Sequence, residues 1–314
     1  RVNTVVFDKT GTLTESRPRV AEVIPGEGYE RDDILRTAAC LEEHFPHPVA
    51  RAVVRKAEQE GLHHQEEHTE VEYVVAHGIA SRLHGKRVLF GSRHYIHHDE
   101  GVPVDAMRED IERLAREGRS ILYPAVDGKL AGLIAIEDPL RPEAAPVIRK
   151  LLGRGIRVVM LTGDDERTAA AVAERLGISE YRSQVLPTDK AAVIRSLQAE
   201  GHTVAMLGDG INDSPALVCA DIGIAVGSGT DIAIDSADVM IAGGSICAVP
   251  LIFRLSKGTM KIIRQNLVWA VIYNIICIPI AAAGIVNPSI AAAAMSLSSN
   301  GVLLNSLRLK NLEK

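Results

Sequence analysis

The sequence predicts an α/β protein with a doubly wound parallel sheet, an inserted α+β domain and a pair of apolar helices at its C-terminal end. Three observations lead to this prediction. A short β-prone run, Val5–Phe7, lies near the start of the chain. From residue 130 to 226, β-prone runs alternate with helical segments. Two long uncharged stretches follow, at residues 266–286 and 289–307. The alternation is typical of a parallel sheet covered by helices.

The bulk composition excludes several classes of protein. The chain has 314 residues, a net charge of −5 and 4 cysteines. The negative charge gives no indication of nucleic-acid binding, and the absence of a C-x-x-C pair argues against a zinc ribbon or disulfide scaffold and fits a reducing compartment. Because the chain begins so close to Asp8, we interpret it as a C-terminal piece of a longer protein.

The first strand is expected over Val5–Phe7, and Asp8 stands where it ends. Gly11 permits a sharp turn, and the threonine-rich loop around it offers hydroxyls and backbone N–H groups. Open α/β sheets bind their ligands at the carboxyl ends of parallel strands. Among phosphate-binding groups, such a carboxylate can act as a nucleophile and form an aspartyl-phosphate. The alternative is an ordinary strand followed by an Asp-Gly turn.

Residues 19–129 are predicted to form the separate α+β domain. Its expected helices cover residues 32–41 and 48–60, and its expected strands cover residues 71–75, 87–90 and 121–126. The sequences His84-Gly85-Lys86 and Asp127-Gly128-Lys129 are typical of hairpin turns.

The parallel alternation resumes at Leu130, which we expect to begin a strand of the first domain. That domain would comprise residues 1–18 and 130–250. Its further strands are expected at residues 157–161, 203–207 and 222–226, and its helices at residues 141–154, 166–176, 190–200 and 214–220.

Residues 251–314 are predicted to form a transmembrane hairpin, with helices at about residues 266–286 and 289–309. About 20 uncharged residues suffice to span a bilayer. Basic residues flank both ends of the pair, so both ends, and residues 1–265, are expected on the cytoplasmic side of a multi-pass membrane protein. In a bacterium this would be the cell membrane. A buried core hairpin is the alternative.

Four loops at predicted strand ends carry groups suited to phosphoryl transfer. They contain Asp8 with Thr10, the run Thr162-Gly163-Asp164, the cation Lys190, and the run Asp209-Gly210-Ile211-Asn212-Asp213. Mg²⁺ prefers one or two carboxylates together with phosphate oxygens and water. Each loop alone is a weak indication, but the four in this order are a strong one.

These loops resemble the motifs of P-type ATPases, within the haloacid-dehalogenase-like group of folds. The resemblance covers nearly the whole chain and implies a phosphorylation domain, an inserted nucleotide-binding domain, and ATP and Mg²⁺ as cofactors. It further implies Asp8 as the phosphorylated nucleophile. By the same resemblance, Mg²⁺ is bound by Asp8, the main-chain oxygen of Thr10 and Asp209, with Asp213 in a supporting position. The residues that would bind the phosphoryl group are Thr162, Gly163, Asp164, Lys190 and Asn212. Of these, Thr162 and Lys190 are also implied to be catalytic.

Thr10 has a chemical meaning of its own. Related phosphatases carry an acid two residues after the nucleophile, which protonates the leaving group and later activates water. A threonine cannot perform this acid–base work. The aspartyl-phosphate is therefore expected to persist, as a pump requires. This argues against the alternative of a soluble haloacid-dehalogenase-type phosphatase with a large cap.

The inserted domain resembles the heavy-metal branch of these ATPases. By that resemblance, His47 contacts the adenine with support from Glu42, and Gly78 and Gly91 lie at the nucleotide. Ala76 and Ser92 depart from the branch pattern. The histidine-rich segment 63–98 could sense metal, but we interpret it as a solvated polar loop.

Polar residues in the apolar helices indicate a transported cation. Tyr273 and Asn274 in one helix, with Met295 and Ser299 in the next, resemble the Cu(I) branch, because a thioether is a soft ligand. Asn300 and Cys277 depart from it, and helix packing or a pump for zinc, cadmium, cobalt or nickel are alternatives. The expected partners are the lipid bilayer and the actuator domain and upstream membrane helices, which this chain lacks. Without them the chain could not transport alone and could act only as an ATP- and metal-binding module.

Overall fold

The computed structural model describes residues 2–42, 48–62, 68–74, 78–209, 213–227, 235–284 and 288–312. The chain divides into two compact units, Arg1–Ile246 and Cys247–Lys314, called here the first unit and the hairpin unit.

The first unit contains a six-stranded, wholly parallel sheet. Its strand order is β10 (Glu180–Arg182), β9 (Arg157–Leu161), β1 (Thr4–Asp8), β11 (Val204–Gly208), β12 (Ile222–Val226), β13 (Val239–Ile241). Strand β1 lies between β9 and β11, and Val6 pairs with Val159 on one side and Met206 on the other. All five residues of β1 are buried, which is consistent with the apolar run Val5–Phe7 at its centre. Asp8 is thereby placed at the carboxyl end of a central strand.

Four helices of the described chain accompany this sheet: α4 (Ala144–Leu152), α5 (Glu166–Leu176), α6 (Lys190–Ala199) and α7 (Ser214–Cys219). The start of α5 is capped by Asp165, whose carboxylate accepts hydrogen bonds from the backbone N–H groups of Arg167 and Thr168. Its end is set by Gly177 at φ +73°, a left-handed conformation that glycine adopts without strain. These boundaries agree with the expected helix over residues 166–176.

A second sheet of seven strands is antiparallel. Its order is β2 (Arg19–Pro25), β8 (Gly132–Glu137), β6 (Ser120–Val126), β5 (Lys86–Gly91), β4 (Gly78–Leu83), β3 (His68–Val74), with β7 (Lys129–Leu130) beside β6. Both expected hairpin turns are present, because His84 and Asp127 adopt positive φ before Gly85 and Gly128.

Strand β8 corrects one expectation. We expected residues 130–136 to rejoin the parallel sheet, but β8 pairs antiparallel with both β2 and β6. A central antiparallel strand buried on both faces has the same continuous apolar sequence as a parallel one, so the pattern could not separate the two.

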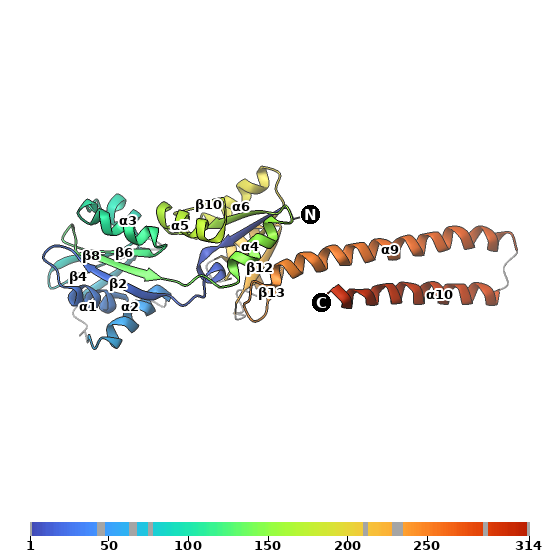
Figure 1. Cartoon of the computed structure of the whole chain (residues 1–314), viewed down its shortest axis with the longest axis horizontal. Helices are drawn as coiled ribbons and strands as arrows, with labels where there is room; N and C mark the ends of the chain where they lie inside the picture. The colour runs from blue at the N-terminus through green and yellow to red at the C-terminus, as the bar shows by residue number, and fades with distance from the viewer. Residues whose placement is uncertain are drawn as a thin grey trace. The chain divides into compact units, whose positions relative to one another are not determined.

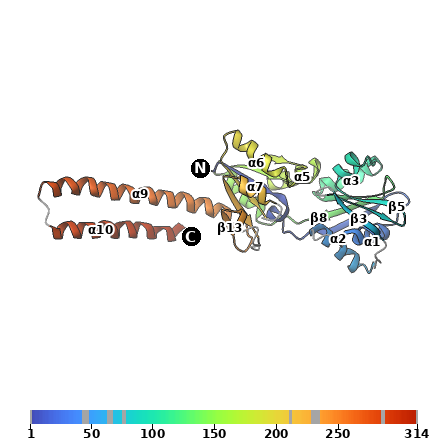
Figure 2. The same ribbon diagram turned by 180° about the vertical axis from the view of Figure 1, so that it is seen from behind.

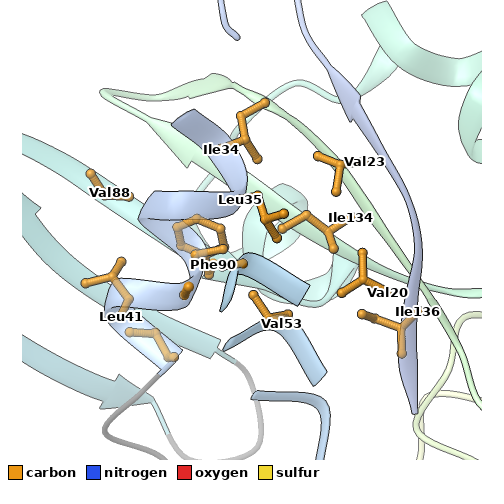
Figure 3. Packing of buried hydrophobic residues seen from close by; sticks show 14 residues of the cluster. Val20, Val23, Ile34, Leu35, Leu41, Val53, Val88, Phe90, Ile134 and Ile136 are labelled. Atoms are coloured by element: carbon orange, nitrogen blue, oxygen red, sulfur yellow. The ribbon is translucent and has the colours of Figure 1, made fainter. Parts of the chain in front are cut away.

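Alternate residues of the antiparallel sheet enter two apolar layers. Ile134 and Ile136 pack with α1 (Arg31–Glu42) and α2 (Pro48–Gln59), whereas Leu133 and Ala135 pack with α3 (Arg108–Arg116) and its neighbours. The helices α1 and α2 lie on the opposite side of this sheet from α3 (Figures 1 and 2). Figure 3 shows the first layer, in which Leu35 of α1 and Val53 of α2 lie among strand residues that include Phe90 of β5. Short helical turns cover His94–Asp99, Asp105–Met107 and Arg308–Leu312, and Lys9–Leu13 form a tight turn in which Thr10 and Gly11 have non-helical backbone angles.

The chain enters and leaves the inserted domain through two adjoining segments. Thr14 and Leu140 form an antiparallel bridge, and the N–H of Glu15 donates to the carbonyl of Pro139 at 2.9 Å. The guanidinium of Arg141 donates to the carbonyls of Thr14 and Gly11, at 2.9 and 3.2 Å. The crossing therefore lies next to the turn that follows Asp8.

The hairpin unit consists of α9 (Ala248–Ala282) and α10 (Pro288–Leu307), which lie side by side (Figure 1). Polar side chains join them near one end: Asn266 donates to Ser306 at 2.9 Å, and Asn305 donates to Asn266 at 2.8 Å. Helix α9 begins 18 residues before the expected residue 266, because the basic segment before it continues the helix. In the part of the chain that the structure describes, α9 alone is long and apolar enough to cross a membrane, by length and composition.

We predict that Ile134→Ala lowers the free energy of unfolding of the first unit by about 3 kcal/mol, because Ile134 is completely buried and the smaller side chain leaves a cavity. Urea denaturation followed by circular dichroism measures the loss. The control is Leu152→Ala, where the side chain is 39% exposed, and it should cost less than about 1 kcal/mol. Equal losses for the two variants would contradict this packing.

Candidate active site

The centre of the site is a buried ion cluster around Lys190. Its ammonium donates to Asp8 Oδ1 at 2.7 Å and to Asp213 Oδ1 at 2.6 Å, and all three side chains are buried. Asp8 comes from the end of β1, Lys190 from the first residue of α6, and Asp213 from the loop after β11. The structure thus brings together three residues that the sequence predicted, up to 205 positions apart.

Burial and neighbouring charge shift both partners of this cluster. Burial, together with the negative charge of Asp213, raises the pKa of Asp8 to about 7, and Lys190 opposes the rise. Although burial favours its neutral form, the two carboxylates raise the pKa of Lys190 above its ordinary value. Lys190 is therefore a permanent cation, and it favours the ionised form of Asp8 that a nucleophile needs.

Two glycines bring the neighbouring loops close together. Gly11 adopts φ +83°, and a Cβ there would lie 3.2 Å from Cβ of Asp209, so the turn after Asp8 approaches the Asp209 loop closely. A Cβ on Gly208 would collide with the carboxyl group of Asp213. That carboxyl also accepts the backbone N–H of Asp209 at 3.2 Å, so Asp213 fixes the loop that carries Asp209. Asn212 lies outside the described residues.

A second ion pair lies beside the first. Lys9 pairs with Asp164, and the hydroxyl of Thr162 donates to the same carboxylate at 2.8 Å. Burial would raise the pKa of Asp164, but Lys9 and its hydrogen-bond donors hold it below the ordinary value. Thr162, Asp164 and the intervening Gly163 follow β9, next to β1. The expected phosphate-binding loop therefore adjoins the carboxylate of Asp8.

The expected nucleotide residues lie in the antiparallel half of the first unit. Gly78 and Gly91 are opposite each other in β4 and β5, and a Cβ on Gly78 would lie 2.9 Å from the Cα of Gly91. Glycine at residue 78 therefore has a packing reason. Glu42 is buried at the end of α1, where burial raises its pKa to about 7. His47 and Ala76 lie outside the described residues, as does part of the histidine-rich segment.

The expected transported-metal residues lie in the hairpin unit. Asn274 donates to the carbonyl of Ala270 in its own helix at 2.9 Å. The side chains of Met295 and Ser299 are exposed on α10, and the structure does not describe the side chain of Tyr273. Their common role stays a prediction.

Comparisons with known proteins identify the family. The family model of haloacid dehalogenase-like hydrolases matches residues 2–221. The chain belongs to this family. It is 42% identical over 310 residues to a probable copper-exporting P-type ATPase V of Mycobacterium tuberculosis, covering 99% of this chain and 40% of that protein. A copper-exporting P-type ATPase of Bacillus subtilis is 42% identical over 313 residues, covering 100% of this chain and 39% of that protein.

This haloacid dehalogenase-like chain is also similar to solved structures of ATPases. A zinc-transporting PIB-type ATPase in its E2.Pi state has a TM-score of 0.66 and 35% identity, covering 98% of this chain and 50% of that one. The catalytic domain of the CPx-ATPase CopB-B has a TM-score of 0.63 and 27% identity, covering 80% and 88%. The predicted fold class and the resemblance to heavy-metal P-type ATPases are confirmed, and the predicted membrane localisation agrees with these relatives and with α9. The chain spans about 40% of the length of the curated relatives it matches.

The residues present fit a magnesium ion. In the described chain no cluster of three or more His, Cys, Asp or Glu side chains has metal-ligand geometry, but Mg²⁺ needs only one or two carboxylates with other oxygens. Asp8 and Asp213 both pair with Lys190, and the negative charge of Asp209 also acts on Asp8, so these three carboxylates outnumber the one cation among them. Asp8, Asp209 and the main-chain oxygen of Thr10 are the groups that would hold the ion, and Asp213 would support them.

The sequence analysis missed two residues of the site. Lys9 lies between Asp8 and Thr10, and this position directly after the candidate nucleophile was the signal that could have found it. Ser120 gave no signal, because it is an ordinary strand residue 112 positions from Asp8 and reaches the site only through the fold.

We predict that Glu42→Gln stabilises the nucleotide-free protein at pH 8 and has little effect at pH 4.5. The buried carboxyl has a pKa of about 7 when folded against 4.5 when unfolded, so the folded state holds its proton longer and stability falls as pH rises between these values. The gain at pH 8 is on the order of 3 kcal/mol. Urea denaturation at several pH values measures it.

The matched control is Glu174→Gln, on an exposed position of α5, which should leave the pH dependence unchanged. A constant difference between Glu42→Gln and wild type across this pH range would show that the carboxyl of Glu42 is not held neutral.

Proposed function

We propose that this chain is the catalytic portion and a helical hairpin of an ATP-driven transition-metal pump that forms an aspartyl-phosphate on Asp8. The observation that carries the proposal is the buried Asp8–Lys190–Asp213 cluster at the carboxyl end of the central parallel strand. The similarity to copper-exporting P-type ATPases extends over 99% of the chain, hairpin included, which favours a pump over a soluble phosphatase.

In the proposed reaction, a carboxylate oxygen of Asp8 attacks the γ-phosphorus of ATP. The new P–O bond forms as the bond to the bridging oxygen breaks, and ADP leaves with that electron pair. Lys190 favours the ionised form of Asp8 and orients its carboxylate, and Thr162 and the backbone of Gly163 lie in the loop that would bind the phosphoryl oxygens. When bound, Mg²⁺ would supply positive charge that offsets the charge of the phosphate oxygens and carboxylates.

Thr10 supports the proposed persistence of the phosphorylated state. It provides no acid or base two residues after the nucleophile, so the acyl-phosphate waits for a water activated elsewhere. Glu42, Gly78 and Gly91, in the antiparallel half, are the proposed nucleotide contacts of the described chain, and His47 is proposed with them.

We predict that Asp8→Asn abolishes phosphoenzyme formation in the full-length protein. The amide keeps the shape of the side chain but is not a nucleophile. The measurement is acid-stable, hydroxylamine-sensitive labelling from ATP carrying a radioactive γ-phosphate. Asp105→Asn, at an exposed position, should label like wild type. Labelling of Asp8→Asn that hydroxylamine removes would place the nucleophile elsewhere.

The proposed cargo is Cu(I), with Ag(I) as its soft analogue. The sequence from Gln265 to Leu307 has no charged residue, and Met295 is its only thioether. A thioether without a carboxylate favours a soft monovalent cation. The structural similarity to a zinc-transporting ATPase favours the second candidate, a pump for zinc or a related divalent cation. The missing acidic side chain argues against that candidate.

We predict that Cu(I) or Ag(I) stimulates the ATPase activity of the full-length protein and that Met295→Ala weakens this stimulation, because the soft ligand is lost. Titration of ATPase rate against each metal measures the effect. The control is Leu297→Ala, another exposed apolar residue of α10, which should respond like wild type. Stimulation by Zn²⁺ but not by Cu(I) would reject copper and leave the phosphoryl-transfer proposal intact.

A further inference from the structure

Ser120 connects the inserted domain to the phosphoryl-transfer site. It is the first residue of β6, where it pairs with Ile136 in the antiparallel sheet. Its hydroxyl nevertheless donates to Asp164 Oδ1 at 2.6 Å and accepts from the ammonium of Lys9 at 3.3 Å. One hydroxyl thus completes the hydrogen bonding of an ion pair that belongs to the other sheet.

The neighbouring surfaces hold this hydroxyl in place. The hydroxyl of Thr168, on α5, donates to the carbonyl of Arg119 at 3.2 Å, one residue before Ser120. Arg167, also on α5, pairs with Glu112 on α3 at 3.1 Å. The segment leading into β6 is therefore fastened to the first turn of α5, which directly follows the loop of Asp164.

We infer that Ser120 is a positioning residue for phosphoryl transfer from ATP: it links the seating of the inserted domain to the Lys9–Asp164 ion pair beside Asp8. The inference rests on the proposed function. Both ion-pair partners are nearly buried, so a lost partner is not readily replaced by water. A hydroxyl is needed because the group must donate to a carboxylate and accept from an ammonium at the same time.

The phosphoenzyme can form by two routes, from ATP or from inorganic phosphate, and the proposed role of Ser120 predicts a different effect on each. Transfer from ATP requires the inserted domain to bring nucleotide to Asp8. Formation from inorganic phosphate, the reverse of hydrolysis, uses no nucleotide and therefore does not require the inserted domain to deliver one. A residue that acts by seating the inserted domain should affect the first route and spare the second.

The test compares both routes in the full-length protein, using Ser120→Ala, Ser120→Thr and wild type. We expect Ser120→Ala to slow labelling from saturating ATP roughly tenfold, the value of one hydrogen bond to a charged group. Labelling from inorganic phosphate should stay within twofold of wild type. Ser120→Thr, which keeps the hydroxyl, should restore the ATP rate, and Ser196→Ala on the exposed side of α6 should change neither route.

Three results would overturn the inference: an unchanged ATP rate in Ser120→Ala, an equal loss on both routes, which would indicate a general disturbance of Asp164, or no recovery in Ser120→Thr. Failure of wild type to form any phosphoenzyme would instead overturn the proposed function, and this inference with it. The wild-type arm therefore distinguishes the two failures.

Discussion

The first unit depends on the placement of one ammonium group between two buried carboxylates. Without Lys190, Asp8 and Asp213 would bring like charges together in a site where water screens them poorly. With it, the end of β1, the start of α6 and the loop after β11 converge on one point. The parallel sheet supplies the geometry, because β9 and β11 flank β1 and bring their own terminal loops to the same edge.

The inserted domain is joined to the parallel-sheet half next to the loop that follows Asp8. Both crossings run together at Thr14 and Leu140, and Arg141 binds their backbone and that of the turn after Asp8. The antiparallel sheet has its own apolar layers, separate from the core of the parallel sheet. An independently packed domain on a narrow attachment is suited to rigid-body motion. Contacts such as the hydrogen bonds of Ser120 to Asp164 and Lys9 would then depend on the position of the inserted domain.

The hairpin unit follows a different physical rule from the first unit. Its apolar side chains, among them Leu267, Trp269 and Ile275, are exposed in the described structure rather than packed in a core. The polar side chains that join α9 and α10 are amides and hydroxyls, which can satisfy one another without charge. Such a pair of helices is suited to a lipid environment and to contact with further helices.

The sequence by itself was enough to predict most residues of the candidate site. Motifs at strand ends identified Asp8, Thr162, Lys190 and Asp209, because a β-prone run followed by a glycine turn and a polar group is a local signal. Turn chemistry likewise located two hairpin turns of the insertion. What only the tertiary structure decided was which segments are partners: β8 pairs within the antiparallel sheet, and Ser120 reaches Asp164. Strand pairing and long-range hydrogen bonds depend on which segments meet in space, and an apolar run or a lone serine has the same local sequence whichever partner it finds.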